Sequence, residues 1–292
     1  MTDLGTLGGN SSVAYGVNAS GQIVGEASTA NNSDDRAFSY SGGSMTDLGT
    51  LGGGSSVAYG VNASGQIVGY AQTPGNAAIH AFSYSGGSMT DLGTLGGTYS
   101  FAYGVNASGQ IVGYAQTPGN AAHAFSYLGG SMMDLGTLGG NNSFAYGVNV
   151  NGQIVGDSDT PGNAAHHAFS YSGGSMTDLG TLGGTTSNAY GINTSGQIVG
   201  DSSTGNNDLD AILYANGVMT DLNTLLPANS GWRLESAQAI NDSGQIVGYG
   251  LIGGQEHAFL LDTAAPEPAT ITLFGAGTAC LVLLRRRRQR NQ

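Results

Sequence analysis

The sequence contains no lysine and a single cysteine, Cys280, among its 292 residues. One cysteine excludes a disulfide framework and a cysteine-based metal site within the chain. Charged residues are only 9% of the total, whereas glycine occurs 52 times. The absence of a Gly-X-Y period excludes collagen, and a hydrophobic content of 39% with 14 tyrosines is too high for disorder. The composition therefore predicts a folded, turn-rich, all-β protein.

Positive charge is scarce before the C-terminus. The body that precedes Pro266 holds two arginines, Arg36 and Arg233, and 18 acidic residues, so its formal charge is −16. Such a charge repels phosphate backbones and anionic lipid surfaces, which argues against nucleic acid as a partner. An acidic polysaccharide would also be repelled unless cations bridged the two surfaces.

The C-terminus combines three features in a fixed order. Pro266, Glu267 and Pro268 form an extended, non-helical segment, because proline restricts both itself and the residue before it. Residues 269–284 carry no charge and predict a single hydrophobic helix close to the ~20 residues that span a membrane. A cluster of arginines then favours the cytoplasmic side of that membrane: Arg285, Arg286, Arg287, Arg288 and Arg290.

These three features resemble the PEP-CTERM sorting signal of Gram-negative bacteria. The resemblance implies processing by an exosortase, a membrane-embedded protease, after transient anchoring in the inner membrane through the C-terminal helix. It further implies release or transfer to the cell surface or the extracellular space, and a link with exopolysaccharide and biofilm. Such proteins carry an N-terminal export signal, whereas this sequence starts at Met1 inside a repeat. We therefore expect a start site assigned too late or a fragment.

Six tandem copies of about 44 residues fill residues 1–264, and residues 265–292 form the sorting tail. Each copy begins with Met-Thr-Asp-Leu-Gly-Thr-Leu or a close variant, and each contains an intact Gly-Gln-Ile-Val-Gly. Most copies also contain Tyr-Gly-Val/Ile-Asn before this pentapeptide and an Ala-Phe step after it. The copies begin at Met1, Met45, Met89, Met132, Met176 and Met219.

Each copy predicts four short antiparallel strands with turn residues at every junction. In the first copy we place them at residues 14–18, 22–27, 38–41 and 45–51. A repeat of this length with four strands has the size of a β-propeller blade, so six copies predict six blades. The alternatives are seven blades with one lost from the N-terminus, or an open array.

The chain ends predict how the ring closes. Residues 1–7 correspond to the fourth strand of a blade, and residues 257–261 correspond to the third. In the other copies these two strand types form a hairpin, so we expect the first segment to pair with the last strand and remove the open edges. The repeats as a whole resemble the HAF extracellular repeats, a family named for the His-Ala-Phe step, which implies an extracellular location rather than a particular activity.

Two side chains recur once per copy. The aspartate of Met-Thr-Asp-Leu is expected to hold turn amides, and the histidine before Ala-Phe is expected to be packed or hydrogen-bonded within its blade. His166 and His167 are adjacent, and adjacent strand residues face opposite ways, so the two are not expected to share a metal ion.

The candidate ligand residues lie where the copies differ. Asp157, Asp159 and Asp201 are calcium candidates in oxygen-rich loops, against the alternative of solvated turns. Trp232 and Arg233 are candidate ligand contacts in the sixth copy, because exposed Trp and Arg often anchor ligands. The alternative is that Trp232 fills the core of the terminal blade.

No nucleophile elbow, phosphate loop or zinc-type cluster is present, so the sequence indicates no catalytic residue and no cofactor. The sequence therefore predicts a non-enzymatic surface or matrix protein, with surface polysaccharide as a candidate partner. The alternatives are a carbohydrate-binding module, which exposed aromatic residues on one rim would favour, and a glycan-active hydrolase using loop carboxylates, which a non-repeating polar cluster would favour.

Overall fold

The computed structural model describes residues 1–30 and 34–263. Over these ranges the chain is all-β, with three short 3₁₀ turns and no α-helix, and no helix in them is long and apolar enough to cross a membrane. The expected C-terminal helix, the segment from Pro266 to Pro268 and the arginine cluster lie outside the described residues.

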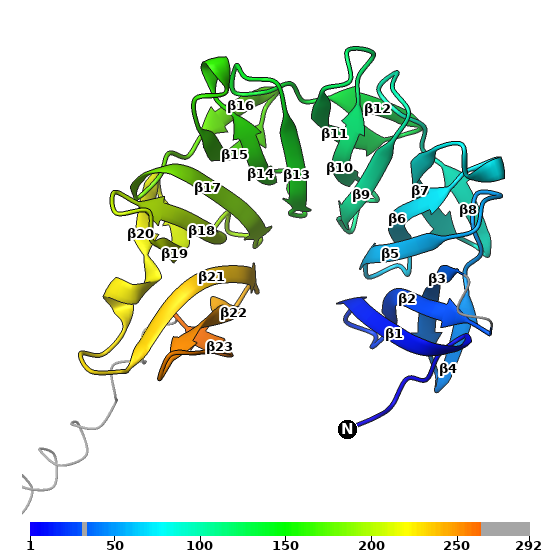
Figure 1. The fold of residues 1–292 in the computed structure, drawn as a ribbon, viewed down its shortest axis with the longest axis horizontal. Helices are drawn as coiled ribbons and strands as arrows, with labels where there is room; N and C mark the ends of the chain where they lie inside the picture. The colour runs from blue at the N-terminus through cyan, green and yellow to red at the C-terminus, as the bar shows by residue number, and fades with distance from the viewer. Residues whose placement is uncertain (31–33, 264–292) are drawn as a thin grey trace, which may run out of the picture.

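The described chain forms six antiparallel blades around a common axis (Figure 1), and one parallel bridge between His166 and Thr186 joins the fourth and fifth blades into an eight-stranded sheet. The first blade contains β1 (Gly8–Val17), β2 (Ile23–Thr29), β3 (Asp35–Ser41) and β4 (Ser44–Asp47). The second contains β5 (Ser56–Val61), β6 (Ile67–Gln72), β7 (Ile79–Ser85) and β8 (Ser88–Asp91). The third contains β9 (Ser100–Val105), β10 (Ile111–Gln116), β11 (Ala122–Leu128) and β12 (Ser131–Asp134).

The second half of the ring repeats the pattern and then departs from it. The fourth blade contains β13 (Ser143–Val148), β14 (Ile154–Asp159), β15 (His166–Ser172) and β16 (Ser175–Asp178). The fifth contains β17 (Gly183–Ile192), β18 (Ile198–Thr204), β19 (Leu209–Ala215) and β20 (Val218–Asp221). The sixth has three strands, β21 (Trp232–Ile240), β22 (Gln245–Ile252) and β23 (Gln255–Asp262). The 3₁₀ turns are Pro74–Asn76, Pro161–Asn163 and Leu222–Leu225.

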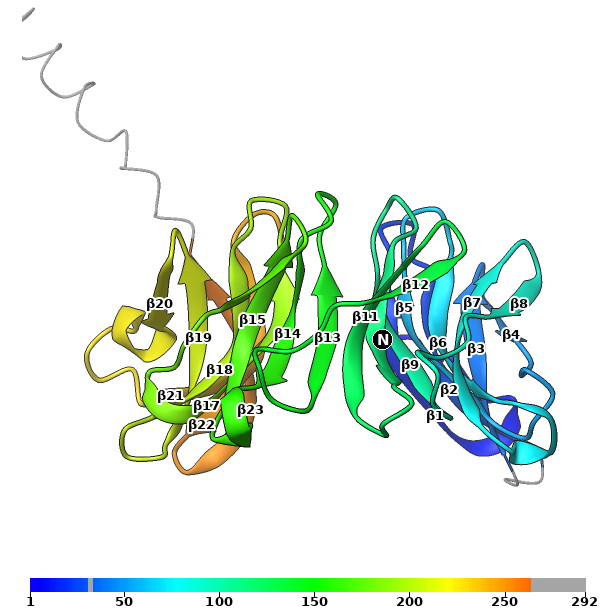
Figure 2. The same cartoon turned by 90° about the horizontal axis from the view of Figure 1, so that it is seen from above.

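The blades stand side by side with their first strands nearest the axis (Figure 2). The Gly-Val or Gly-Ile pairs of five first strands, and Ala239 with Ile240 in the sixth, line one hollow of about 320 Å³. The predicted propeller of about six blades is therefore confirmed as an architecture of radially arranged sheets.

The fourth strand of the first blade is shorter than predicted. In the first blade we expected it to run to Leu51, whereas β4 ends at Asp47. The Asp47 carboxylate accepts a hydrogen bond of 2.7 Å from Gly49 N, and Gly49 has a φ of +79° that only glycine adopts readily. The chain therefore turns directly after the aspartate, and Leu48 is buried beneath the turn.

The hydrophobic core is divided among the interfaces between blades. The first cluster joins Val24, Ala37 and Leu48 of one blade to Ala58 and Phe82 of the next, and four further clusters follow the same arrangement around the ring. The Ala-Phe step supplies the largest fully buried side chains, since Phe38, Phe82, Phe125 and Phe169 are 0% exposed. Each blade is therefore stabilised mainly by its neighbours.

Glycine allows the blades to approach closely at the axis. A Cβ atom on Gly60 would lie 2.8 Å from the carbonyl oxygen of Tyr103 in the next blade, and one on Gly104 would lie 2.9 Å from that of Tyr146. Any larger residue at these positions would push neighbouring blades apart.

A chain of asparagine hydrogen bonds also joins the blades. Within its own hairpin, Asn106 Oδ1 accepts from the backbone N–H groups of Ser108 and Gln110. Its Nδ2 donates to the carbonyl oxygen of Asn149 in the next blade at 3.0 Å. The same interblade bond runs, at 3.0 to 3.2 Å, from Asn18 to Asn62, Asn62 to Asn106, Asn149 to Asn193 and Asn193 to Asn241.

The predicted closure of the ring by strand pairing is not present. Within the described ranges β23 pairs with β22 alone, and residues 1–6 form no strand. Ala258 is exposed although its counterparts in blades two to four are 0% exposed, and Ser12 is exposed although Ser56 is 0% exposed. The interfaces between neighbouring blades fix the rotation of each blade against the next, and together they leave the first and last blades apart.

We expect Asn106→Ala to lower the free energy of unfolding by about 2 kcal/mol, because it removes buried hydrogen bonds and leaves their partners unsatisfied. Asn241→Ala is the matched control, because Asn241 makes the same bonds within its hairpin, including the one from Nδ2 to Gln245, and in the described ranges its Nδ2 reaches no further blade. Urea denaturation should show the smaller loss for Asn241→Ala. Equal losses would contradict a stabilising role for the interblade bond.

Candidate functional site

The recurring aspartate and histidine form structural pairs. The aspartate caps the following turn in every copy, as in the 2.7 Å bond from Gly93 N to Asp91. His80 Nδ1 lies 2.8 Å from the same Asp91, and His123–Asp134 and His167–Asp178 repeat this contact. Both expectations are therefore confirmed for these blades, where one carboxylate holds the outer strand, whereas His257 of the sixth copy is exposed and its ring lies 6.3 Å from that of Trp232.

Trp232 and Arg233 lie on neighbouring positions of β21 but have separate surroundings. Trp232 is half-buried, packs against the core between blades five and six, and lines an apolar hollow of about 220 Å³ with residues of β23. Arg233 forms ion pairs with Asp208 at 3.4 Å and Asp210 at 3.2 Å. The packing of Trp232 fits the core-filling alternative, and Arg233 is engaged by two carboxylates.

The three calcium candidates are divided between two blades. Asp157 and Asp159 both contact His166 in the fourth blade, whereas Asp201 in the fifth bonds Asn188 at 2.7 Å and Ser236 at 2.8 Å. Over residues 1–30 and 34–263 no group of three or more His, Cys, Asp or Glu side chains has an arrangement that would hold a metal ion. The calcium interpretation stays a prediction.

The most distinctive feature of the described surface is an aromatic hollow of about 430 Å³ where blades two, three and four meet. Its walls are Ile79 of β7, four partly exposed aromatic rings, Ala122 of β11 and Asn142, which lies just before β13. The aromatic rings are Tyr99, Phe101, Tyr114 and Phe144.

The rings support one another in a continuous row. Phe101 and Tyr114 stack with centroids 5.0 Å apart, and Tyr114 meets the edge of Phe144 at 4.8 Å. Tyr70 extends the row on one side, with its centroid 4.8 Å from that of Phe101, and His166 extends it on the other, 6.5 Å from Phe144. Sugars stack on exposed aromatic rings through the C–H groups of one sugar face.

The row arises from substitutions within the repeat. The strand register places Phe101 and Phe144 in the position that holds Val13 and Val57 in the first two blades. The strand opposite carries Glu26, Tyr70, Tyr114, Asp157, Asp201 and Tyr249 from the first blade to the sixth. The hollow is therefore an asymmetric feature of a nearly symmetric ring, and sequence reasoning missed it because only the differences between copies signal it.

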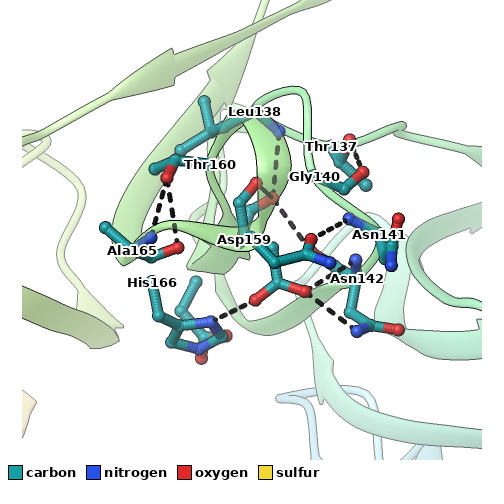
Figure 3. A network of polar contacts seen from close by, with 12 residues as sticks. Thr137, Leu138, Gly140, Asn141, Asn142, Asp159, Thr160, Ala165 and His166 are labelled. Atoms are coloured by element: carbon teal, nitrogen blue, oxygen red, sulfur yellow. Dashed lines mark hydrogen bonds and ion pairs between the residues drawn. The ribbon is translucent and has the colours of Figure 1, made fainter.

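A polar network around Asp159 lies behind Asn142, the residue that it shares with the lining of the hollow (Figure 3). Asn142 Oδ1 accepts from Ala122 N at 3.1 Å, while Asn142 Nδ2 donates to Asp159 Oδ2 at 2.9 Å. His166 Nδ1 lies 3.0 Å from Asp159 Oδ1, and His166 Nε2 forms an ion pair with Asp157 Oδ2 at 2.5 Å. That Asp157 oxygen is buried and makes no well-directed hydrogen bond, so the ion pair is its partner.

The network sets the charge of its members. The close ion pair with Asp157, opposed by burial, raises the pKa of His166 to about 9, so the imidazole is positively charged at neutral pH. Burial acts to raise the pKa of Asp159, but the hydrogen bonds from His166 and Asn142 outweigh it and lower this pKa. Burial also raises the pKa of Tyr114, which therefore stays a neutral hydroxyl.

Comparison with protein families identifies the tail. Residues 264–288 match the PEP-CTERM protein-sorting motif. The predicted sorting signal is therefore confirmed for that segment, whereas the HAF resemblance of the repeats stays an interpretation. No curated protein matches the chain.

Several solved structures resemble the chain at low identity. The Aleuria aurantia lectin in complex with Fucalpha1-6GlcNAc is 15% identical, with 90% of this chain and 100% of that chain covered and a TM-score of 0.43. Another structure of that lectin, described as a six-bladed β-propeller, is 14% identical with the same coverage and a TM-score of 0.32. TolB from Acinetobacter baumannii is 12% identical, with 78% of this chain and 56% of that chain covered and a TM-score of 0.48. These similarities are too distant to transfer a ligand.

We expect His166→Gln to destabilise the protein most below about pH 6.5 and least above about pH 9. The folded-state pKa of about 9 exceeds the usual 6.5, so the stabilisation is fully present below 6.5 and is lost as the pH rises through 9. Thermal unfolding of both proteins from pH 5.5 to 10 measures this difference. A difference that stays constant across the range would show that the imidazolium ion pairs do not stabilise the fold.

Proposed function

We propose that the protein is an exported, non-enzymatic carbohydrate-binding protein of the cell surface or extracellular matrix, which binds sugar in the aromatic hollow. The observation that carries this proposal is the group of four partly exposed rings around a hollow of about 430 Å³. Ligand pockets of this kind combine an apolar wall with a few placed polar groups, and here Asn142 and the tyrosine hydroxyls supply the polar groups.

The sorting motif supports the cellular location. A PEP-CTERM segment at residues 264–288 fits an exported protein that is held transiently in the membrane and processed by an exosortase. Fucose-binding lectins among the similar structures agree with sugar binding, but the proposal rests on the hollow itself. A role in biofilm, in which the protein attaches to exopolysaccharide, extends the same proposal.

A glycan-active hydrolase is the competing proposal, and the non-repeating Asp157–His166–Asp159 cluster is the observation that favours it. The carboxylates of this cluster bind the imidazole and Asn142 rather than opening into the hollow. Asp157 is only 1% exposed, so a substrate would not reach it without rearrangement. The binding function is therefore the better supported of the two.

We expect the double substitution Phe101→Val and Phe144→Val to weaken glycan binding at least about tenfold, because loss of stacking on two rings costs more than 1.4 kcal/mol. Valine occupies the same place in the first two blades, so the fold should be retained. Tyr15→Leu is the control, because Tyr15 is exposed on β1 outside the hollow. Glycan-array screening followed by calorimetry on the best ligand measures the effect, and equal affinity of all three proteins would overturn the assignment of the hollow.

We expect a form of the protein with an added export leader to lose its tail in a host that contains an exosortase. The combined substitution Pro266→Ala and Pro268→Ala should keep the protein uncleaved in the membrane fraction, because the extended segment becomes able to continue as helix. Pro227→Ala, which replaces a proline outside the matched segment 264–288, is the control. Cell fractionation followed by intact-mass measurement shows where each protein lies and whether it is cleaved. Cleavage of the Pro266/Pro268 variant at the wild-type rate would contradict a role for this segment.

A further inference from the structure

The polar part of the hollow is a carboxamide held in one orientation. Asn142 uses its Oδ1 for Ala122 N and one N–H for Asp159, which leaves one N–H of the carboxamide for a ligand. Asp159 accepts from both the backbone N–H and the side chain of Asn142, and His166 holds Asp159 from the other side. Asp159 and His166 are therefore positioning residues for the donor that meets a sugar oxygen.

The network that holds Asn142 has a net negative charge. Two carboxylates, Asp157 and Asp159, share the single positive charge of His166. Asp201 is 2% exposed in the next blade and is held by the neutral partners Asn188 and Ser236. Of these three carboxylates, only Asp159 bonds a lining residue of the hollow, Asn142, and Asp157 lies behind it on the same imidazole.

Neither arginine of the described body offsets the charge that remains beside His166. Arg36 pairs with Asp47 at 3.8 Å in the first blade, and Arg233 pairs with Asp208 and Asp210 at the fifth and sixth. The rest of the wall is aromatic or aliphatic. A carboxylate bound here would lose water and gain no positive partner, and like-charge contacts at an interface cost several kcal/mol.

We infer that the hollow selects uncharged sugars and rejects sugars that carry a carboxylate, because its donor Asn142 is bonded to Asp159 and the Asp157–His166–Asp159 cluster behind Asn142 has a net negative charge. This inference rests on the proposed function of the hollow. The neutral sugar lies with an apolar C–H face on the aromatic rings and one hydroxyl oxygen at Asn142 Nδ2. Uronic acids of the same ring geometry are excluded by charge rather than by shape.

Paired ligands test the inference. Calorimetry on the whole protein at low ionic strength compares oligosaccharides of glucose, galactose and mannose with the uronate oligosaccharides of the same stereochemistry and length. We expect at least about tenfold tighter binding of the neutral member of whichever pair binds, and a smaller ratio at high salt because ions screen the repulsion.

Substitutions taken from the repeat itself change the charge with side chains that another blade already accommodates at the same positions. The triple substitution Asp157→Tyr, Asp159→Gln and His166→Ala gives the fourth blade the residues of the third, where Tyr114, Gln116 and Ala122 stand. We expect it to lower the neutral-to-uronate ratio at least threefold. His166→Gln removes the cation alone and should raise the ratio.

Asp134→Asn is the matched control, since it removes one negative charge at the outer edge of the third blade, where Asp134 pairs with His123. It should leave the ratio at the wild-type value. Equal binding of neutral and uronate ligands by the wild type, or a ratio that the triple substitution does not lower, overturns the inference alone. Failure of every glycan in the panel and on the array overturns the proposed function as well.

Discussion

The ring depends on one asparagine in each copy, which holds its own hairpin and, in five of the six blades, also bonds the next blade. Its Oδ1 accepts the backbone N–H groups that shape its own hairpin, and in the first five blades its Nδ2 reaches the backbone carbonyl of the next. A side chain that closes a turn and joins two sheets couples local and long-range structure in one step. Because neighbouring blades also meet at glycine, this bond keeps its length of 3.0 to 3.2 Å around the ring.

Much of the blade is readable from the sequence, because its turns and buried positions follow local rules. Asp47 and Gly49 predict a turn, and the Ala-Phe step that is buried in the first four blades predicts a core strand. The fourth strand was predicted too long because the apolar residues Leu48 and Leu51 continue the strand pattern, whereas the bond from Gly49 N to Asp47 ends the strand at Asp47. Ring closure was mispredicted because it depends on the summed rotation of five interfaces, which no single copy encodes.

The candidate site, in contrast, depends on residues that differ between the copies. Residues that repeat, such as Asp91 and His80, pair with each other and stabilise the blade. Residues that break the repeat, such as Phe101 and Phe144, build the hollow, although each looks like ordinary core in isolation. Its depth and neighbours depend on which blades become adjacent, so sequence reasoning reached Asp157 and Asp159 but not their connection through His166.

The asparagines that join the blades also carry a chemical liability. Asn18, Asn62 and Asn106 each begin an Asn-Ala-Ser sequence, which eukaryotic secretory enzymes recognise as a site for sugar attachment. In the folded ring Asn62 and Asn106 are 5% exposed and their amides are committed to the next blade. A glycan attached before folding would block that contact, so a eukaryotic secretory pathway would produce a chain unable to assemble its blades.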